Sequence, residues 1–337
     1  MPKISVVMSI YKEPIEWIKA SIESVLCQTF SDFEFIIVND NPSGSENTVL
    51  LNSYVEKDNR IKIILNEQNQ GLTKSLNKAL QVAQGDYIAR MDADDICFPQ
   101  RFAKQISFME LHRDCVALGS AARIIDENGK TGRKWNVYED WHQLQCSILF
   151  YSPIVHPTAF FKRIVNGTAI KYDETFKYSQ DYALWSSLIK NNVICNIPDV
   201  LLYYRLSSGQ ISSKNQMAQR ECAIRIERTI INNMGYSCDD SIIQSLASIT
   251  KPQKEGDNYD SVLKCVFSFV KSNHNNQFYD RAITGKCLFV CFSNYLAINA
   301  SLFDGIGQLL SLTSKIRYFN TYSFFSMIYK IYRRRKH

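Results

Sequence analysis

Residues 86–95 read DYIARMDADD, a short β-prone run that is followed by three carboxylates within four positions. The pattern predicts a strand that ends at Asp92 and turns directly after it. Carboxylates this close repel one another, and a divalent cation among them offsets that repulsion. The oxygens of Asp92 and Asp94 suit Mg²⁺ or Mn²⁺, which keep coordination positions open for phosphates. The segment indicates an enzyme that handles a nucleotide diphosphate through a metal, or else a solvated acidic turn.

Upstream of this segment, apolar runs of strand length alternate with stretches of helical spacing. The predicted strands are Ile4–Ile10, Phe33–Val38, Ile61–Leu65 and the one ending at Asp92, and the predicted helices are Trp17–Cys27, Val49–Lys57 and Leu72–Ala83. This alternation predicts an α/β fold with a Rossmann-like, mostly parallel sheet flanked by helices. Ligands bind such sheets at the carboxyl ends of the strands, which selects the loops after Ile10, after Val38 and at Asp92.

Beyond Phe98 the pattern is mixed, and beyond Gln210 it becomes helical. The mixed part has predicted helices at Pro99–Glu110 and Tyr182–Lys190 and predicted strands at Val116–Ile125, Ala159–Lys162 and Leu201–Leu206. The later predicted helices are Gln216–Met234, Ser241–Ile249, Asp260–Ser272, Phe278–Asn299 and Thr321–Tyr332. We predict a catalytic domain at 1–213, with a nucleotide-binding half at about 1–97 and an acceptor half at about 98–213, and a helical C-terminal region at 214–337.

The composition fits a folded protein with a sizeable core. Of 337 residues, 45% are apolar and 12% aromatic, and the net charge is only +6. No stretch approaches the ~18–20 apolar residues of a membrane span, and the short N-terminal apolar run does not resemble a signal peptide. The ten cysteines form no Cys-x-x-Cys pair, which disfavours a zinc site or a disulfide framework.

Six short motifs occur in order: ISVVMSIY at 4–11, SIESVLCQTF at 21–30, FEFIIVND at 33–40, NQGL at 69–72, LNKA at 76–79 and ARMDADD at 89–95. Together they resemble glycosyltransferases of family 2, which have the GT-A fold, and in particular the bacterial enzymes of O-antigen and capsular polysaccharide synthesis. The resemblance covers roughly residues 1–212. It implies that a sugar moves from a nucleotide-sugar to an acceptor hydroxyl with inversion at the anomeric carbon.

In such an enzyme, the acidic segment is expected to bind the metal ion. The departing diphosphate accumulates negative charge, which Mn²⁺ or Mg²⁺ held by Asp94, with help from Asp92, would stabilise. The resemblance also offers an alternative for Asp92, which is a contact to the ribose. Asp95 could bind the metal indirectly or cap the next helix, and we expect the cap.

Three more residues are candidates for contacts to the donor. Asp40 ends the second strand, where it could accept a hydrogen bond from the uracil ring; its alternative is an Asx-turn. Lys74 and Arg90 could lie near the diphosphate, or they could be surface and strand-edge charges.

A second carboxylate must act as the base, because direct inversion requires a proton acceptor on the face opposite the leaving group. Residues 172–185, YDETFKYSQDYALW, resemble the second signature of the family, and Asp181 matches its catalytic aspartate. A position at the start of a helix favours a carboxylate, so an N-cap is the structural alternative. Gln180 stands where an acidic neighbour is commoner.

The acceptor side has weaker candidates. His156, with Pro157 and Thr158, precedes a predicted strand as in many bacterial members, and could contact the acceptor. Arg205 and Gln210 belong to a segment that resembles the closing loop of the domain. Relatives often have a histidine two residues after this arginine, where the chain has Ser207, which puts a phosphate contact by the loop in doubt.

The last segment of the chain is basic and aromatic. Its charged residues are Lys315, Arg317, Lys330, Arg333, Arg334, Arg335 and Lys336, interleaved with Tyr318, Phe319, Tyr322, Phe324, Phe325, Tyr329 and Tyr332. Such a segment suits an anionic membrane surface. Nucleic-acid binding and a solvated helix end are the alternatives, and we do not expect nucleic acid as a partner.

The predicted function is metal-dependent, inverting transfer of a hexose or N-acetylhexosamine from a UDP-sugar, with UDP-glucose or UDP-galactose expected first. The acceptor would be an undecaprenyl-diphosphate-linked saccharide, and the enzyme would act as a peripheral protein at the cytoplasmic face of the bacterial inner membrane. A nucleotidyltransferase is an alternative, but it needs a glycine-rich basic loop where residues 11–14 read YKEP. A non-catalytic nucleotide-sugar-binding module is another, and it would not need Asp181.

Overall fold

The computed structural model describes residues 1–149, 151–207, 215–233 and 302–316, together with short helical pieces at 284–286, 288–289, 292–293 and 295–296. The chain divides into two compact units. The first comprises Met1–Trp141 and Ser152–Gln219, and the second comprises His142–Tyr151 and Arg220–His337. The predicted domain boundary between 213 and 214 falls in the segment 208–214, outside the described residues.

The first unit is built on one mixed sheet with the strand order β3-β2-β1-β4-β8-β6-β11-β5, and β7 pairs with β6. The strands are β1 Ile4–Ile10, β2 Phe33–Asn39, β3 Ile61–Leu65, β4 Tyr87–Asp92, β5 Ile96–Cys97, β6 Cys115–Ile125, β7 Thr131–Trp135, β8 Phe160–Lys162 and β11 Val193–Arg205. Strands β1 to β4 are parallel, as are β6 and β11, whereas β5, β7 and β8 pair antiparallel. The predicted mostly parallel α/β sheet is confirmed.

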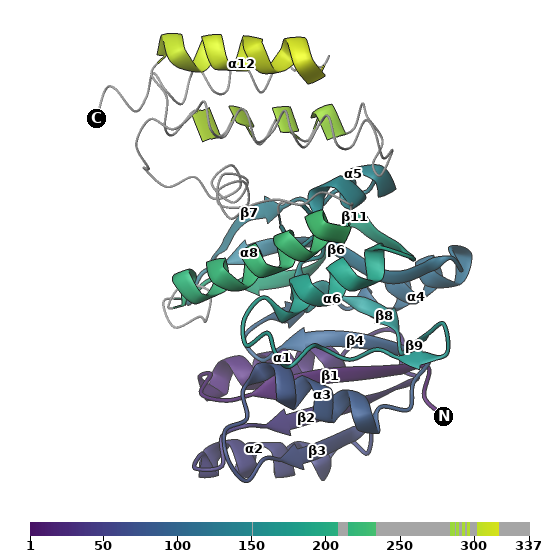
Figure 1. The fold of residues 1–337 in the computed structure, drawn as a ribbon. Helices are drawn as coiled ribbons and strands as arrows, with labels where there is room; N and C mark the ends of the chain where they lie inside the picture. The colour runs from purple at the N-terminus through teal and green to yellow at the C-terminus, as the bar shows by residue number, and fades with distance from the viewer. Residues whose placement is uncertain are drawn as a thin grey trace. The chain divides into compact units, whose positions relative to one another are not determined.

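Helices cover both faces of this sheet (Figure 1). Apolar residues of α1 (Ile15–Leu26), α2 (Ser45–Val55) and α4 (Arg101–Leu111) share one buried cluster with β1 and β2. Helix α3 (Leu72–Val82) packs on β1 and β2. Because the chain reverses direction across the sheet between β3 and β4, right-handed crossovers place α3 on the opposite face. Helix α6 (Gln180–Ile189) contacts β11, and its Trp185 ring lies 5.8 Å from that of Phe161 on β8.

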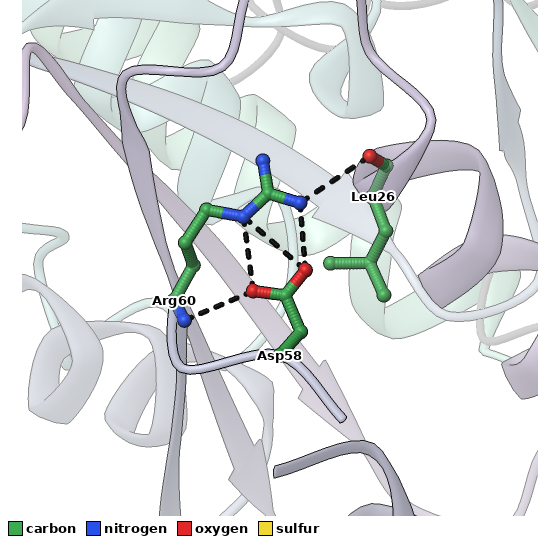
Figure 2. A network of polar contacts seen from close by, with 3 residues as sticks. All are labelled: Leu26, Asp58 and Arg60. Atoms are coloured by element: carbon green, nitrogen blue, oxygen red, sulfur yellow. Dashed lines mark hydrogen bonds and ion pairs between the residues drawn. The ribbon is translucent and has the colours of Figure 1, made fainter. Parts of the chain in front are cut away.

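A bidentate ion pair closes the connection between α2 and β3 (Figure 2). The Arg60 guanidinium donates from Nε to Asp58 Oδ1 at 2.9 Å and from Nη2 to Asp58 Oδ2 at 2.6 Å. Nη2 also donates to the Leu26 carbonyl at the end of α1, at 3.4 Å. A cation at a helix C-terminus interacts favourably with the unpaired carbonyls there. This pair therefore ties the edge strand β3 to α1, at a distance from the strand ends that carry the candidate site.

The predicted strands recur within a residue or two, except that the strand predicted at 201–206 begins at Val193. Helix α1 starts two residues before its predicted start because Pro14 precedes it, and α2 starts four residues early, after Gly44. Within residues 1–207, the elements that were not predicted are the two-residue strand β5, the exposed strand β7, helix α5 (Trp141–Ser147), the 3-10 helix at His156–Thr158 and the hairpin of β9 (Ile164–Val165) and β10 (Thr168–Ala169). These are short or solvent-facing, so their sequences have weak apolar periodicity.

The helical character predicted for the C-terminal region is present wherever that region is described. Helix α8 spans Gln216–Asn233, close to its predicted bounds, whereas α12 spans Leu302–Ile316, where no helix was predicted. The helices predicted at 241–249, 260–272 and 321–332 lie outside the described residues. In the ranges that are described, none of the helices combines the length and the apolar character that crossing a membrane requires.

Candidate active site

Three strand ends meet at one edge of the sheet. Strand β1 lies between β2 and β4, and its Ser9 pairs with Val38 on one side and Asp92 on the other. Asp40 follows β2, and its N–H donates to the Ile10 carbonyl at 2.9 Å. The loops after β1, β2 and β4 are therefore neighbours, as predicted from the sequence.

The acidic segment forms a compact cluster. Carboxylate oxygens of Asp92, Asp94 and Asp95 all lie within 4.8 Å of one another. Asp95 is buried, and within the described part of the chain its Oδ2 has no hydrogen-bond partner. Burial, followed by the charges of Asp94 and Asp92, raises the pKa of Asp95 well above its usual range. A hard divalent cation fits this donor set because its charge would offset the repulsion among the three carboxylates and it could interact with the unpaired Asp95 Oδ2. The metal roles of Asp92 and Asp94 stay predictions.

Asp95 does not cap the next helix. The residue before α4 is Gln100, five positions further on, because the short strand β5 intervenes. Asp95 instead accepts the backbone N–H of Arg205 on Oδ1 at 2.8 Å. The predicted helix cap is wrong, and the carboxylate joins the end of β11 to the acidic loop.

Arg205 reinforces the same junction. Its buried guanidinium donates to the Asp94 carbonyl at 2.8 Å and to the carbonyls of Asp126 and Glu127 at 3.1 and 3.3 Å. It also lies over the ring of Trp17, 4.8 Å from the centroid. These contacts give Arg205 a structural role, while the predicted acceptor contact stays a prediction. Gln210 lies outside the described residues.

Two further charged residues adjoin Asp92. The Arg90 guanidinium is 2% exposed and forms an ion pair through Nη2 with Asp92 Oδ1. Glu13, in the loop after β1, accepts the Tyr11 N–H at 2.7 Å, and burial, together with the charge of Asp92, raises its pKa. Sequence reasoning missed Glu13, although a glutamate three residues beyond a buried strand was a usable signal. The predicted contact of Arg90 with the diphosphate stays a prediction.

Asp40 organises the loop before α3. Its Oδ1 accepts the Asn66 side-chain amide and the Gln70 N–H, both at 2.7 Å, and its Oδ2 accepts the Gly71 N–H at 2.8 Å. Gly71 has a φ of +83°, which a residue with a side chain adopts at a cost. Lys74 stands exposed in the first turn of α3. The donor contacts predicted for Asp40 and Lys74 stay predictions.

The Asx-turn considered for Asp40 belongs to its neighbour. Asn39 Oδ1 accepts the N–H of Asn41 at 3.1 Å. The Asp40 carboxylate is thus directed away from that turn and toward the 66–71 loop.

Asp181 is the second residue of α6, close to the predicted helix start. Its Oδ2 accepts the Ser152 hydroxyl at 2.9 Å. Burial raises the pKa of Asp181, and the Ser152 hydroxyl, the Tyr182 N–H and the charge of Arg90 oppose this rise. Ser179, just before the helix, has a φ of +57°, an uncommon conformation that is often found near functional residues. Such a carboxylate has the proton affinity and the local order that a general base needs. Its role as base stays a prediction.

Helix α3 fixes the segment that leads to Asp181. The buried Asn77 donates to the Tyr172 carbonyl at 3.0 Å and accepts the Tyr172 N–H at 2.8 Å. It also donates to Glu174 Oε1 at 3.0 Å, and Thr73 donates to the Phe176 carbonyl at 3.1 Å. Helix α3 thereby sets the position of residues 172–176, which lead to Asp181. The sequence did contain a signal for this contact, because Asn77 is a polar residue on the apolar face of a predicted helix.

His156 lies in the 3-10 helix that precedes β8, and Gln180 is the first residue of α6. His156 Nε2 lies 2.8 Å from the Tyr172 hydroxyl, and burial, with the charge of Arg90, lowers the pKa of His156 well below its usual value. The ring is therefore neutral at physiological pH. Gln180 is buried at the start of α6. Contacts of either residue with the acceptor stay predictions.

Comparison with known proteins decides the family. The sequence model described as Glycosyl transferase family 2 matches residues 5–167. An uncharacterized glycosyltransferase of Methanocaldococcus jannaschii is 41% identical over 208 residues, which are 61% of this chain and 71% of that protein. The chain belongs to glycosyltransferase family 2. This membership identifies a glycosyl-transferring enzyme and excludes the nucleotidyltransferase alternative.

Two other comparisons extend the result for this family 2 glycosyltransferase. The O-antigen biosynthesis glycosyltransferase WbnJ of Escherichia coli is 34% identical over 223 residues, covering 65% of this chain and 85% of that protein. The crystal structure of S. aureus TarS residues 1–349 with UDP-GlcNAc superimposes with a TM-score of 0.58 at 15% identity, covering 98% of this chain and 92% of that one. The GT-A fold predicted from the sequence is confirmed.

Proposed function

We propose that this family 2 glycosyltransferase transfers a hexose or N-acetylhexosamine from a UDP-sugar, with inversion, in a metal-dependent reaction. The observation that carries the proposal is the division of the carboxylates into two groups. Asp92, Asp94 and Asp95 form a cluster at the end of β4. Asp181 lies apart at the start of α6, with the Ser152 hydroxyl and not the cluster as its hydrogen-bond partner.

Each group suits one half of an inverting displacement. A metal held by Asp94 and Asp92 would neutralise the charge that develops on the departing diphosphate. Asp181 would accept the proton of the attacking hydroxyl, and its raised pKa favours that transfer. Asp40 and Lys74, at the adjacent strand end and helix start, would contact the nucleotide.

The acceptor in this proposal is a saccharide linked to a lipid diphosphate. Similarity to an O-antigen biosynthesis glycosyltransferase supports this class of acceptor. The family resemblance implies that such a polysaccharide is built on a lipid-diphosphate carrier. His156 and Gln180 lie in the segments beside Asp181 and would line the acceptor side.

A donor screen tests the proposal. Purified protein is incubated with UDP-, GDP- and dTDP-sugars and a GlcNAc-diphospholipid analogue, with and without Mn²⁺. We expect transfer from a UDP-hexose or UDP-N-acetylhexosamine only when the metal is present, and an inverted anomeric configuration by NMR. Retention of configuration, or equal rates after treatment with EDTA, would contradict the proposed mechanism.

The basic aromatic tail suggests how the enzyme meets a lipid-linked acceptor. We propose that residues 317–337 bind an anionic membrane surface, as judged from their composition. Truncation after Ile316, where α12 ends, should abolish co-sedimentation with vesicles containing phosphatidylglycerol. Neutral phosphatidylcholine vesicles serve as the control. Equal sedimentation of the full and truncated chains would refute this role.

A further inference from the structure

We propose that Arg90 is a positioning residue of the transfer reaction, whose guanidinium holds Asp92 on the donor side and places a positive charge beside Asp181 on the acceptor side. The inference rests on the proposed function, because it takes Asp92 and Asp181 as the donor-side and base carboxylates. The direct contact of Arg90 with the diphosphate is a separate prediction.

The position of Arg90 is fixed by the sheet. Its backbone N–H donates to the Ala159 carbonyl at 2.9 Å, and its own carbonyl accepts a 2.8 Å bond from Arg101 Nη2. The side chain is 2% exposed, and its Nη2 pairs with Asp92 Oδ1. Removing one partner of a buried ion pair leaves an uncompensated charge, so this pair constrains Asp92 strongly.

The guanidinium is only partly paired. Within the described part of the chain, Arg90 Nε and Nη1 are buried and have no hydrogen-bond acceptor. The nearby Arg101 is equally buried, yet its Nε donates to Gln105 Oε1 at 3.0 Å and its Nη2 to the Arg90 carbonyl. The same region can therefore satisfy a buried arginine. Arg90 instead keeps two buried nitrogens without acceptors and is stabilised by its ion pair with Asp92. Unpaired buried donors cost free energy, and perturbed charged groups of this kind are common at functional sites.

The groups that face Arg90 come from both halves of the site. Three carboxylates, Asp92, Asp95 and Asp181, feel its charge. The other titratable groups on which its charge acts are His156, Tyr172 and Tyr204. All three are neutral, because burial lowers the pKa of the imidazole and raises that of the two phenols. Among the described groups around Asp181, Arg90 thus supplies a positive charge that lowers the pKa of Asp181 and opposes the rise caused by burial.

Kinetics of Arg90→Met and Arg90→Lys give the first test. We expect Arg90→Met to lower kcat about 10- to 100-fold, the usual effect of losing a residue that orients a ligand-binding carboxylate. The acidic limb of its pH–rate profile should move to higher pH, because Asp181 loses the nearby charge. Arg90→Lys should return the limb toward the wild-type position.

Arg101→Met is the matched control, since Arg101 is a buried arginine that pairs with carbonyl and amide oxygens instead of a carboxylate. It should destabilise the fold but leave the acidic limb in place. An unmoved limb in Arg90→Met, or the same shift in both variants, would overturn the inference.

A second test does not depend on activity. Thermal unfolding of wild type, Arg90→Met, Asp181→Asn and the double variant is measured well above the usual pKa of aspartate. We expect the loss of Tm from Arg90→Met to be smaller in the Asp181→Asn background, because the buried carboxylate no longer needs the cation. Additive losses of Tm from Arg90→Met and Asp181→Asn would overturn the inference. Absence of sugar transfer by the wild type would refute the proposed function. The four Tm values would still show whether Arg90 and Asp181 interact, because they do not depend on activity.

Discussion

Asp181→Asn is expected to lower kcat for sugar transfer by about 10²- to 10⁴-fold, the contribution typical of a general base. The amide keeps the size of the side chain and can still bond the Ser152 hydroxyl, so the fold and the donor site should be retained. Metal-dependent binding of UDP, measured by calorimetry, should therefore be unchanged. This combination separates loss of the base from loss of the donor site.

The neighbouring carboxylate of Asp173 provides the control. It is exposed in the segment before α6, and its Oδ1 accepts the Thr175 N–H at 2.9 Å. Asp173→Asn should leave transfer near the wild-type rate. Full activity in Asp181→Asn, or an equal loss in both variants, would remove Asp181 from the base role.

Asp181 also predicts a pH dependence of the transfer rate and of stability. Because burial raises the pKa of Asp181, the rate should rise with pH along a limb that lies above the usual range of aspartate. The sign for stability is the opposite. The folded state binds the proton more tightly than the unfolded chain, so the contribution of Asp181 to the free energy of unfolding falls as pH rises through the raised pKa. Asp181→Asn should remove both dependences.

Asp94→Asn should abolish transfer by a different route. An amide at this position removes one negative charge from the cluster, and we expect UDP affinity in the presence of Mn²⁺ to fall at least about 10-fold. UDP affinity in EDTA should match that of the wild type. Titration of UDP into both proteins, with and without Mn²⁺, makes the comparison.

Undiminished Mn²⁺-dependent UDP binding by Asp94→Asn would contradict the metal assignment. Asp92→Asn is a less selective probe, since it also breaks the pair with the buried Arg90. The contrast with Asp181→Asn is the essential result, because the donor-side variant should lose binding and chemistry together.

How far the sequence predicted the site differs from residue to residue. The strand ending at Asp92 and the helix beginning near Asp181 follow from apolar periodicity, which depends on residues close in the chain. The partner of Asp95 could not be predicted in this way. It is the N–H of Arg205, 110 positions away, and the short strand β5 that separates Asp95 from α4 has only two residues.

By itself, the sequence determined the alternation of strands and helices, the placement of acidic residues at a strand end, and, through its ordered motifs, the family. Only the tertiary structure decided that Asn77 holds Tyr172, 95 positions away, and that the charge of Arg90 on β4 acts on Asp181 at the start of α6. The physical reason is range. Periodicity and turn chemistry are local, whereas a buried ion pair or amide contact depends on which distant segments pack together and on how deeply they exclude water.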